Sequence, residues 1–130
     1  MNSISNRQVI ADLYESFTTG DAQAMFRAHN ERTVWIEPGT NTRSGVFRGP
    51  DAIMQHVTNC MELTGGTWGT EVAEIIGGDN YVIVVERALG QRNGKSLALM
   101  CTTVYEMADG AVAEIRVLPF DAAVWEDFWS

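Results

Sequence analysis

Glu37 is the residue of this sequence whose type and position best suit acid/base chemistry. It ends a short apolar segment, Thr33 to Glu37, that Pro38 and Gly39 interrupt. If that segment is a strand, the side chains of Thr33, Trp35 and Glu37 share one face. A carboxylate beside a desolvating indole has a raised pKa, which suits a general base. The alternative is a strand-end glutamate in solvent, because perturbed acids mark functional sites only statistically.

Three further residues could take part in proton transfer, each beside a simpler structural explanation. His56 lies one residue from the apolar stripe of a helical segment. It titrates near neutrality, and we expect it at the edge of a pocket or, more simply, in a flanking or a solvent-exposed position. Asp121 precedes a last helical segment, where capping alone explains it. Tyr14 lies on an apolar helix face, where a tyrosine at a pocket or core rim is the simpler account.

The motifs of several other site classes do not occur in this sequence. We find no paired His or Cys spacing for zinc, no glycine-rich phosphate loop and no Gly-x-Ser-x-Gly elbow. No metal site and no cofactor are implied.

The charge and the cysteines limit the partners and the compartment. The formal net charge is −8, and the few basic residues are scattered. Nucleic acid and anionic membranes are therefore disfavoured, because neutralising phosphates needs clustered Lys and Arg. The N-terminus lacks the apolar core of a signal peptide, and no apolar run approaches the length of a membrane span. Cys60 and Cys101 are expected to be unpaired, buried thiols, which favours the cytoplasm.

The elements that must position these residues begin with helices. Ser5 and Gln8 have capping-box spacing, and Gly20 can end the first helix. A second helix is expected from Asp21 to His29. Thr40 to Gly49 has the composition of a polar loop, Pro50 suits the first turn of a third helix, and Gly65-Gly66 closes that helix.

From Thr67 onwards the hydrophobic period changes to two. The expected strands are Thr67–Ile76, Tyr81–Gly90, Ser96–Met107 and Val112–Phe120, separated by Gly77-Gly78-Asp79, Asn93-Gly94 and Asp109-Gly110. Asp121 can then cap a short helix. Each Asn-Gly or Asp-Gly turn allows two registers, so which of Glu86 and Arg87 faces the helices stays open.

This order of elements predicts one α+β domain over residues 1–130, with a curved antiparallel sheet wrapped round the N-terminal helices. A pocket is expected between the first helix, Trp35, the third helix and the concave sheet face. The residues expected to line it are Leu13, Tyr14, Phe17, Trp35, Val57, Cys101, Thr103 and Tyr105. The strand Ser96–Met107 is apolar on both faces, which predicts a homodimer through the outer sheet face.

Six short motifs follow one another along nearly the whole chain: Phe17-Thr18-Thr19-Gly20-Asp21, Trp35-Ile36-Glu37-Pro38-Gly39, Phe47-Arg48-Gly49-Pro50-Asp51-Ala52-Ile53, Gly65-Gly66-Thr67, Asp109-Gly110 and the ending Asp121 to Trp129. In this order and spacing they resemble the SnoaL-like branch of the nuclear transport factor 2-like superfamily. The resemblance implies a cone-shaped α+β fold, the cystatin-like roll, with a pocket at its wide end and usually a dimer. Members include ketosteroid isomerase, polyketide cyclases, epoxide hydrolases, dehydratases and proteins without an assigned activity.

The resemblance also bears on single residues. In ketosteroid isomerase the base is a carboxylate before a Pro-Gly-like turn, and Glu37 matches that position. Tyr14 lies on the same helix as the isomerase's oxyanion-stabilising Tyr, but Leu13 holds the matching place. The isomerase's second donor, an Asp, falls near Thr103, where no acid stands, so steroid isomerisation is not expected. Asp121 lies near the acid/base Asp of the cyclases. The Arg-and-two-Asp arrangement of the epoxide hydrolases is not recognisable.

The sequence therefore leaves three functions open. The first is a cofactor-independent isomerase, cyclase or (de)hydratase acting on an apolar carbonyl or polyketide-like compound through Glu37, with Asp121, His56 or Tyr14 as further groups. The second is a non-catalytic binding module for a hydrophobic ligand or partner. The third is a dimerising scaffold with a collapsed pocket. A cavity lined with Trp, Tyr and a buried carboxylate favours the first function, and a cavity without convergent polar groups favours the second.

Overall fold

The first helix begins and ends at the residues that its sequence predicts. In the computed structural model, which describes residues 5–20 and 27–130, α1 spans Asn6–Thr19. The Ser5 hydroxyl accepts a hydrogen bond from the Gln8 amide at 3.2 Å, which caps the helix. Gly20 follows with φ 72°, the left-handed conformation that glycine adopts without strain. The second helix expected from Asp21 rests on residues 21–26, which lie outside the described residues.

The other elements follow α1 in the order that the sequence predicts, with one addition. They are β1 (Val34–Glu37), β2 (Gly45–Arg48), α3 (Gly49–Leu63), β3 (Gly69–Gly77), β4 (Tyr81–Arg92), β5 (Lys95–Ala108), β6 (Ala111–Pro119) and α4 (Ala122–Trp129). Strand β2 is the addition, because the sequence predicts a polar loop over Thr40 to Gly49. That prediction is wrong for Gly45–Arg48, since this segment pairs with β1 as a short edge strand. No helix in the described ranges is long and apolar enough to span a membrane.

The six strands form one sheet in the order β2-β1-β6-β5-β4-β3. The α+β class with a curved sheet is confirmed, and the four long strands β3 to β6 pair antiparallel as predicted. Strand β1 adds to this sheet by pairing with β6 in parallel, which the long segment of chain between the two permits. Thr33, fully buried, fixes this junction by donating a hydrogen bond to the Val112 carbonyl at 2.6 Å.

Two tight turns set the register of the long strands. Asn93 and Gly94 both have positive φ (51° and 77°), as do Asp109 and Gly110 (53° and 79°). These are the conformations of a two-residue hairpin turn of type I′. The first turn pairs Arg92 with Lys95 and therefore places Glu86 opposite Cys101. Glu86 is buried on the helix side of the sheet and Arg87 is exposed on the other side, which settles the alternative left open above.

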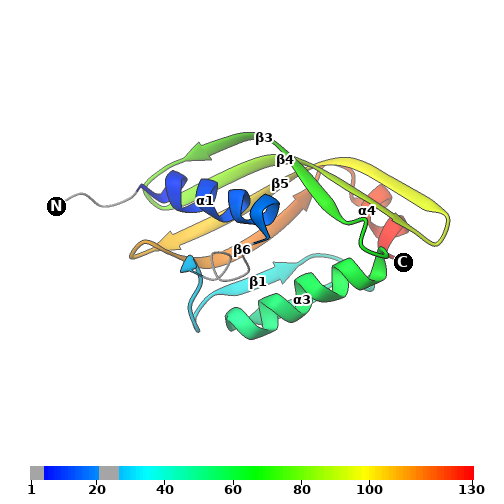
Figure 1. The fold of residues 1–130 in the computed structure, drawn as a ribbon, viewed down its shortest axis with the longest axis horizontal. Coiled ribbons are helices and arrows are strands. Elements are labelled where there is room, and N and C mark those ends of the chain that lie inside the picture. Colours follow the sequence, from blue (N-terminus) through cyan, green and yellow to red (C-terminus); the bar gives the residue numbers. More distant parts are fainter. Residues whose placement is uncertain (1–4, 21–26) are drawn as a thin grey trace.

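The helices cover the concave side of the sheet (Figure 1). Helix α1 packs on β3 and β4, α3 runs along β1 and β2, and α4 packs on β5 and β6. Two buried clusters result, one around Ile10 and Tyr105 and one around Trp125 and Trp129. Trp35 packs against both clusters, so the strand that carries Glu37 lies where they meet.

Candidate functional site

A cavity of about 740 Å³ lies between α1, α3, α4 and the concave sheet face. This volume is typical of sites for small organic molecules. Most of its wall is apolar or aromatic, with three indoles, Trp35, Trp68 and Trp125, among the lining side chains. All eight side chains that the sequence predicts to line a pocket lie on this wall, namely Leu13, Tyr14, Phe17, Trp35, Val57, Cys101, Thr103 and Tyr105. The three residues predicted to be catalytic do not lie on the cavity wall; they are Glu37, His56 and Asp121.

A polar cluster of Tyr14, Glu86 and Tyr105 interrupts the apolar wall. The Tyr14 hydroxyl donates a hydrogen bond to Glu86 Oε2 at 2.6 Å. The hydroxyls of Tyr14 and Tyr105 are 2.8 Å apart, and either can donate. With the Tyr14 proton committed to an ionised Glu86, Tyr105 is the donor of this second bond. When Glu86 is protonated, its carboxyl group donates to the Tyr14 hydroxyl, and Tyr14 in turn donates to Tyr105. The three groups therefore form a continuous hydrogen-bonded path for a proton.

Burial raises the pKa values of all three groups of this cluster. Burial raises the pKa of Glu86 above its ordinary value, although the hydroxyls of Tyr14, Thr103 and Thr70 and the charge of Arg43 partly oppose the shift. Burial and the nearby Tyr105 and Glu86 raise the pKa of Tyr14 well above that of a free phenol. Burial and the Glu86 charge also raise the pKa of Tyr105. Both phenols therefore remain hydrogen-bond donors near neutral pH, beside a carboxyl group suited to exchanging its proton.

Glu37 has the opposite environment. Its side chain is fully buried, and Arg43 Nε lies 2.8 Å from its Oε1. Trp35 Nε1 donates a hydrogen bond to the same oxygen at 3.0 Å. Burial alone would raise the pKa of Glu37, but the Arg43 charge and the contact with His56 outweigh it and lower the pKa. The expectation of a raised pKa beside Trp35 is therefore wrong, because the loop that follows β1 supplies a buried cation.

His56 belongs to this same buried cluster. The sequence predicts it at a pocket edge or in solvent, yet it is 2% exposed. Its Nε2 lies 3.3 Å from Glu37 Oε1, and its ring stacks on Phe47 with the centroids 4.0 Å apart. Burial lowers the pKa of His56, against the opposing hydrogen bond of Glu37. A neutral imidazole thus helps to hold Glu37 in place. The solvent-exposed alternative for His56 is wrong, and its ring instead flanks the cavity behind Trp35, with the ring centroids 5.0 Å apart.

Arg43 connects this cluster to the cavity. It lines the cavity wall, although the sequence places it in a polar loop. Its guanidinium carbon lies 4.4 Å from the ring centroid of Trp68, 5.0 Å from that of Trp125 and 5.1 Å from that of Trp129. Such cation–π contacts hold a desolvated guanidinium in a fixed orientation.

Asp121 and the two cysteines have structural surroundings. Asp121 Oδ1 accepts a hydrogen bond from the Val124 amide at 3.1 Å, so the capping explanation is confirmed. Cys60 and Cys101 are free and buried, as expected. Burial raises the pKa of Cys60, and burial with the Glu86 charge raises that of Cys101 to about 12. Neither thiol is activated as a nucleophile.

Of the polar residues of this site, sequence reasoning left the face of Glu86 open and missed Arg43. A signal for Glu86 exists: a two-residue turn at Asn93-Gly94 makes it the cross-strand partner of Cys101, which the sequence places inward. No comparable local signal exists for Arg43. Its burial depends on three indoles from two separate segments of the chain, Trp68 before β3 and the pair Trp125 and Trp129 on α4.

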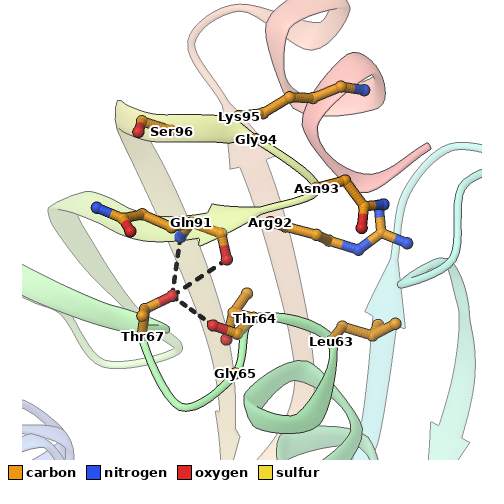
Figure 2. A pocket seen from close by; sticks show the side chains of 10 residues that line it. All are labelled: Leu63, Thr64, Gly65, Thr67, Gln91, Arg92, Asn93, Gly94, Lys95 and Ser96. Carbon is orange, nitrogen blue, oxygen red and sulfur yellow. Dashed lines mark hydrogen bonds between the residues drawn. The ribbon is translucent and has the colours of Figure 1, made fainter.

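A second hollow of about 480 Å³ opens on the surface beside the β4–β5 turn (Figure 2). Its polar groups are occupied by internal contacts: the Thr67 hydroxyl accepts a hydrogen bond from the Gln91 amide and donates to the Thr64 carbonyl. Lys95 Nζ donates to the Asp127 carbonyl at 2.7 Å. The cavity under α1, with its convergent polar groups, is therefore the candidate site.

Comparisons with known proteins agree with this architecture. The family model of the SnoaL-like domain matches residues 10–115. An uncharacterised protein of Mycobacterium tuberculosis is 23% identical over 131 residues, which cover 100% of both chains. The structure of Bal32a, from a soil-derived mobile gene cassette, is similar with a TM-score of 0.89 and 28% identity over 96% of each chain. A nuclear transport factor 2-like protein of Burkholderia thailandensis has a TM-score of 0.84 at 20% identity, over 98% of this chain and 99% of its own.

Proposed function

The chain belongs to the SnoaL-like domain family, and on that premise we propose that it is an enzyme that transfers protons on an apolar carbonyl compound. The observation that carries this proposal is the 2.6 Å hydrogen bond between Tyr14 and Glu86 in the wall of a mostly apolar cavity. A carboxyl group with a raised pKa, two phenol donors and an apolar enclosure are the parts that acid/base catalysis needs. This assigns the base to Glu86 rather than to Glu37.

The proposed reaction begins with the transfer of a proton from a substrate carbon to the carboxylate of Glu86 and ends with its return to the substrate. Ionised Glu86 takes a proton from a carbon next to the substrate carbonyl, and the electron pair moves to the carbonyl oxygen. The phenol hydroxyls of Tyr14 and Tyr105 stabilise negative charge, first on Glu86 and then on the substrate. In an isomerisation, protonated Glu86 returns the proton to another carbon of the substrate as the carbonyl re-forms. In a ring closure, the carbonyl re-forms while the deprotonated carbon attacks a second carbonyl carbon of the same molecule. The new carbon–carbon bond replaces the π bond of that second carbonyl, and Glu86 gives its proton to the resulting alkoxide. In both cases the protons and electrons balance within the substrate and Glu86.

The experiment compares two carboxyl groups buried in the same protein. We expect Glu86→Gln to lower turnover by about a hundredfold or more, the range of general-base contributions. We expect its affinity for apolar ligands to stay within about threefold, because Gln keeps the shape and hydrogen bonding. Substrates are first sought in a panel of ketones, cyclisable polyketides and epoxides. Circular dichroism of each variant provides the folding control.

Glu37→Gln is the matched variant, and it tests the assignment suggested by the resemblance to ketosteroid isomerase. A loss of turnover in Glu37→Gln, with full turnover in folded Glu86→Gln, would make Glu37 the base and contradict the proposal. If apolar ligands bind and no compound of the panel turns over, the binding-module function is the better account.

We further propose that the protein acts as a homodimer in the cytoplasm. Support for the dimer comes from apolar side chains on the outer sheet face, among them Leu118, which is 49% exposed. Support for the compartment comes from the two free, buried cysteines, which a reducing environment keeps in that state.

A further inference from the structure

The cavity meets solvent at three apolar side chains from three different elements, which we call the apolar rim. Phe17 lies in the last turn of α1, Met61 in the last turn of α3 and Val72 on β3. All three line the cavity, yet they are 46%, 36% and 42% exposed. Trp125 lines the same cavity and is buried. The cavity therefore runs from a buried aromatic end to an open apolar rim.

The apolar rim lies beside the polar cluster of the proposed proton transfer. Val72 is the cross-strand partner of Glu86, and such side chains lie on the same face of the sheet with Cβ atoms about 5 Å apart. The ring of Phe17 packs edge-to-face against that of Tyr14, with the centroids 5.4 Å apart. A ligand whose reacting carbon lies at Glu86 therefore has the opening next to that carbon.

A ligand that reaches the apolar rim accounts for its exposure. Single exposed apolar side chains are normal on any protein surface. Here three of them continue the apolar wall of one cavity out to solvent. A ligand confined to the buried end leaves this surface in water, whereas a chain that lies on the rim removes apolar area of both partners from water.

The charges near the opening favour a neutral chain. Glu15 is exposed and lines the cavity beside the rim. The one Arg or Lys on the described part of the wall, Arg43, is buried against Glu37. An anionic group at the opening would therefore meet the carboxylate of Glu15 without an exposed cation to offset the repulsion.

We propose that the ligand is a neutral carbonyl compound with an alkyl chain, and that this chain leaves the cavity over Phe17, Met61 and Val72. The inference rests on the proposed function, because it names the substrate class of the same cavity. The rim residues bind the chain and so determine how far the carbonyl group enters the cavity. They position the substrate and take no proton.

The test measures binding alone, with phenyl ketones that differ in the length of one alkyl chain: acetophenone, butyrophenone, hexanophenone and octanophenone. Calorimetry gives the Kd of each for the wild type and for the double variant Met61→Gln with Val72→Thr. Both substitutions keep the approximate size of the side chain and replace apolar by polar atoms. Ile76→Thr is the matched control, because Ile76 is similarly exposed on β3 but does not line the cavity.

In the wild type we expect the Kd to fall about two- to fourfold for each added methylene group, as partial to full burial of that group predicts. In the double variant, acetophenone should bind within about twofold of its wild-type affinity, and octanophenone at least about fivefold more weakly. Ile76→Thr should reproduce the wild-type series. Circular dichroism controls for folding, and if the double variant does not fold, Met61→Gln alone decides.

The inference is overturned if no probe binds to the wild type, or if acetophenone and octanophenone bind equally well. It is also overturned if lengthening the chain strengthens binding equally in the wild type and the folded double variant. In that case, a lower mass of the double variant in light scattering would assign the rim to a second copy of the chain. Full turnover in Glu86→Gln would remove the proposed function and leave the effect of chain length on binding unaltered.

Discussion

At the scale of single residues, the interior holds two carboxyl groups whose surroundings move their pKa values apart. Glu37 has a cation and two nitrogen donors at one oxygen, and its pKa is lowered. Glu86 has hydroxyl neighbours, and burial raises its pKa. Where the surroundings of two acids move their pKa values apart, the acid with the raised pKa is the one suited to exchanging a proton, and the other stays ionised. The ionised Glu37 is suited to holding Arg43, and Glu86 is suited to the proton transfer that we propose.

Glu86→Gln should change stability with pH in a direction that its pKa determines. Because the folded-state pKa of Glu86 is raised, its carboxyl favours folding most below the ordinary glutamate value of 4.5. That contribution is lost as the pH rises through the raised pKa. Relative to the wild type, Glu86→Gln should therefore gain stability between mildly acidic and neutral pH. Urea unfolding at pH 4 to 8 measures this difference, and a gain that shrinks as the pH rises would contradict the assigned shift.

Glu37→Gln should show the opposite dependence. The folded-state pKa of Glu37 is lowered, so its contribution is present above the ordinary value and is lost as the pH falls through the lowered pKa. At neutral pH the variant leaves Arg43 buried without its counter-charge, which costs about 3–5 kcal/mol for a broken buried pair. The same urea series should show this cost becoming smaller in acid. An equal cost at every pH would mean that the pKa of Glu37 is the same in the folded and unfolded protein, which would contradict the lowered value.

Which of these residues the sequence could identify depends on where their partners lie. Tyr14, Trp35, Thr103 and Tyr105 lie on the cavity wall as predicted, because helix and strand periodicity decides which face a side chain takes. The pKa of Glu37 could not be predicted, because its direction depends on Arg43, six residues later in a loop without a regular pattern.

At the scale of elements, the last helix depends on Asp121, the residue that precedes it and caps it. Helix α4 has eight residues, Ala122–Trp129, and it carries two of the indoles around Arg43. A helix this short has little stability of its own, so capping and packing hold it. Its position therefore determines both the wall of the cavity and the orientation of the guanidinium.

Asp121→Ala should lower the free energy of unfolding by about 1 kcal/mol, because the Val124 amide loses its acceptor. Asp121→Asn should be nearly neutral, since Asn caps almost as well as Asp. Turnover per folded molecule should change little in Asp121→Asn, as the side chain is exposed and lies off the cavity wall. A large loss of turnover in the folded Asn variant would favour the acid/base role that the resemblance to the polyketide cyclases suggests near this position.

The elements that the sequence predicts correctly have local signals. Helix α1 has its serine cap and its glycine end, and the β4–β5 and β5–β6 hairpins have Asn-Gly and Asp-Gly turns. Strand β2 has no such signal. It is four residues long, and its strand conformation depends on β1, which in turn depends on β6 far along the chain.

At the scale of the whole molecule, the outer face of the sheet carries apolar side chains that no helix of the described ranges covers. Ile83 and Val104 are cross-strand partners there, and Leu118 lies opposite Thr102. Exposed apolar area of this kind is typical of surfaces that bind another protein. A second copy of the chain is the partner that we propose.

Leu118→Lys should therefore shift the protein from dimer to monomer, since it places a charge within the proposed interface. Light scattering at tens of micromolar, roughly the range of weak dimers, measures the change. Val124→Lys is the matched control, because Val124 is similarly exposed (45%) but lies on α4. A wild-type monomer at that concentration, or equal masses for the wild type and Leu118→Lys, would contradict the dimer.

The parallel pairing of β1 with β6 has a consequence for how the chain acquires its structure. Val34, Trp35 and Ile36 meet Glu114, Ile115 and Arg116, so synthesis must pass Arg116 before β1 has β6 as its second neighbour beside β2. Hairpins β3–β4 and β4–β5 can form earlier, because loop closure over a few residues is fast. Glu86 is then in place first, and Arg43 and Glu37 close the cavity last. Pulse-labelled hydrogen exchange during refolding should protect the amides of β4 and β5 before those of β1, and simultaneous protection would contradict this order.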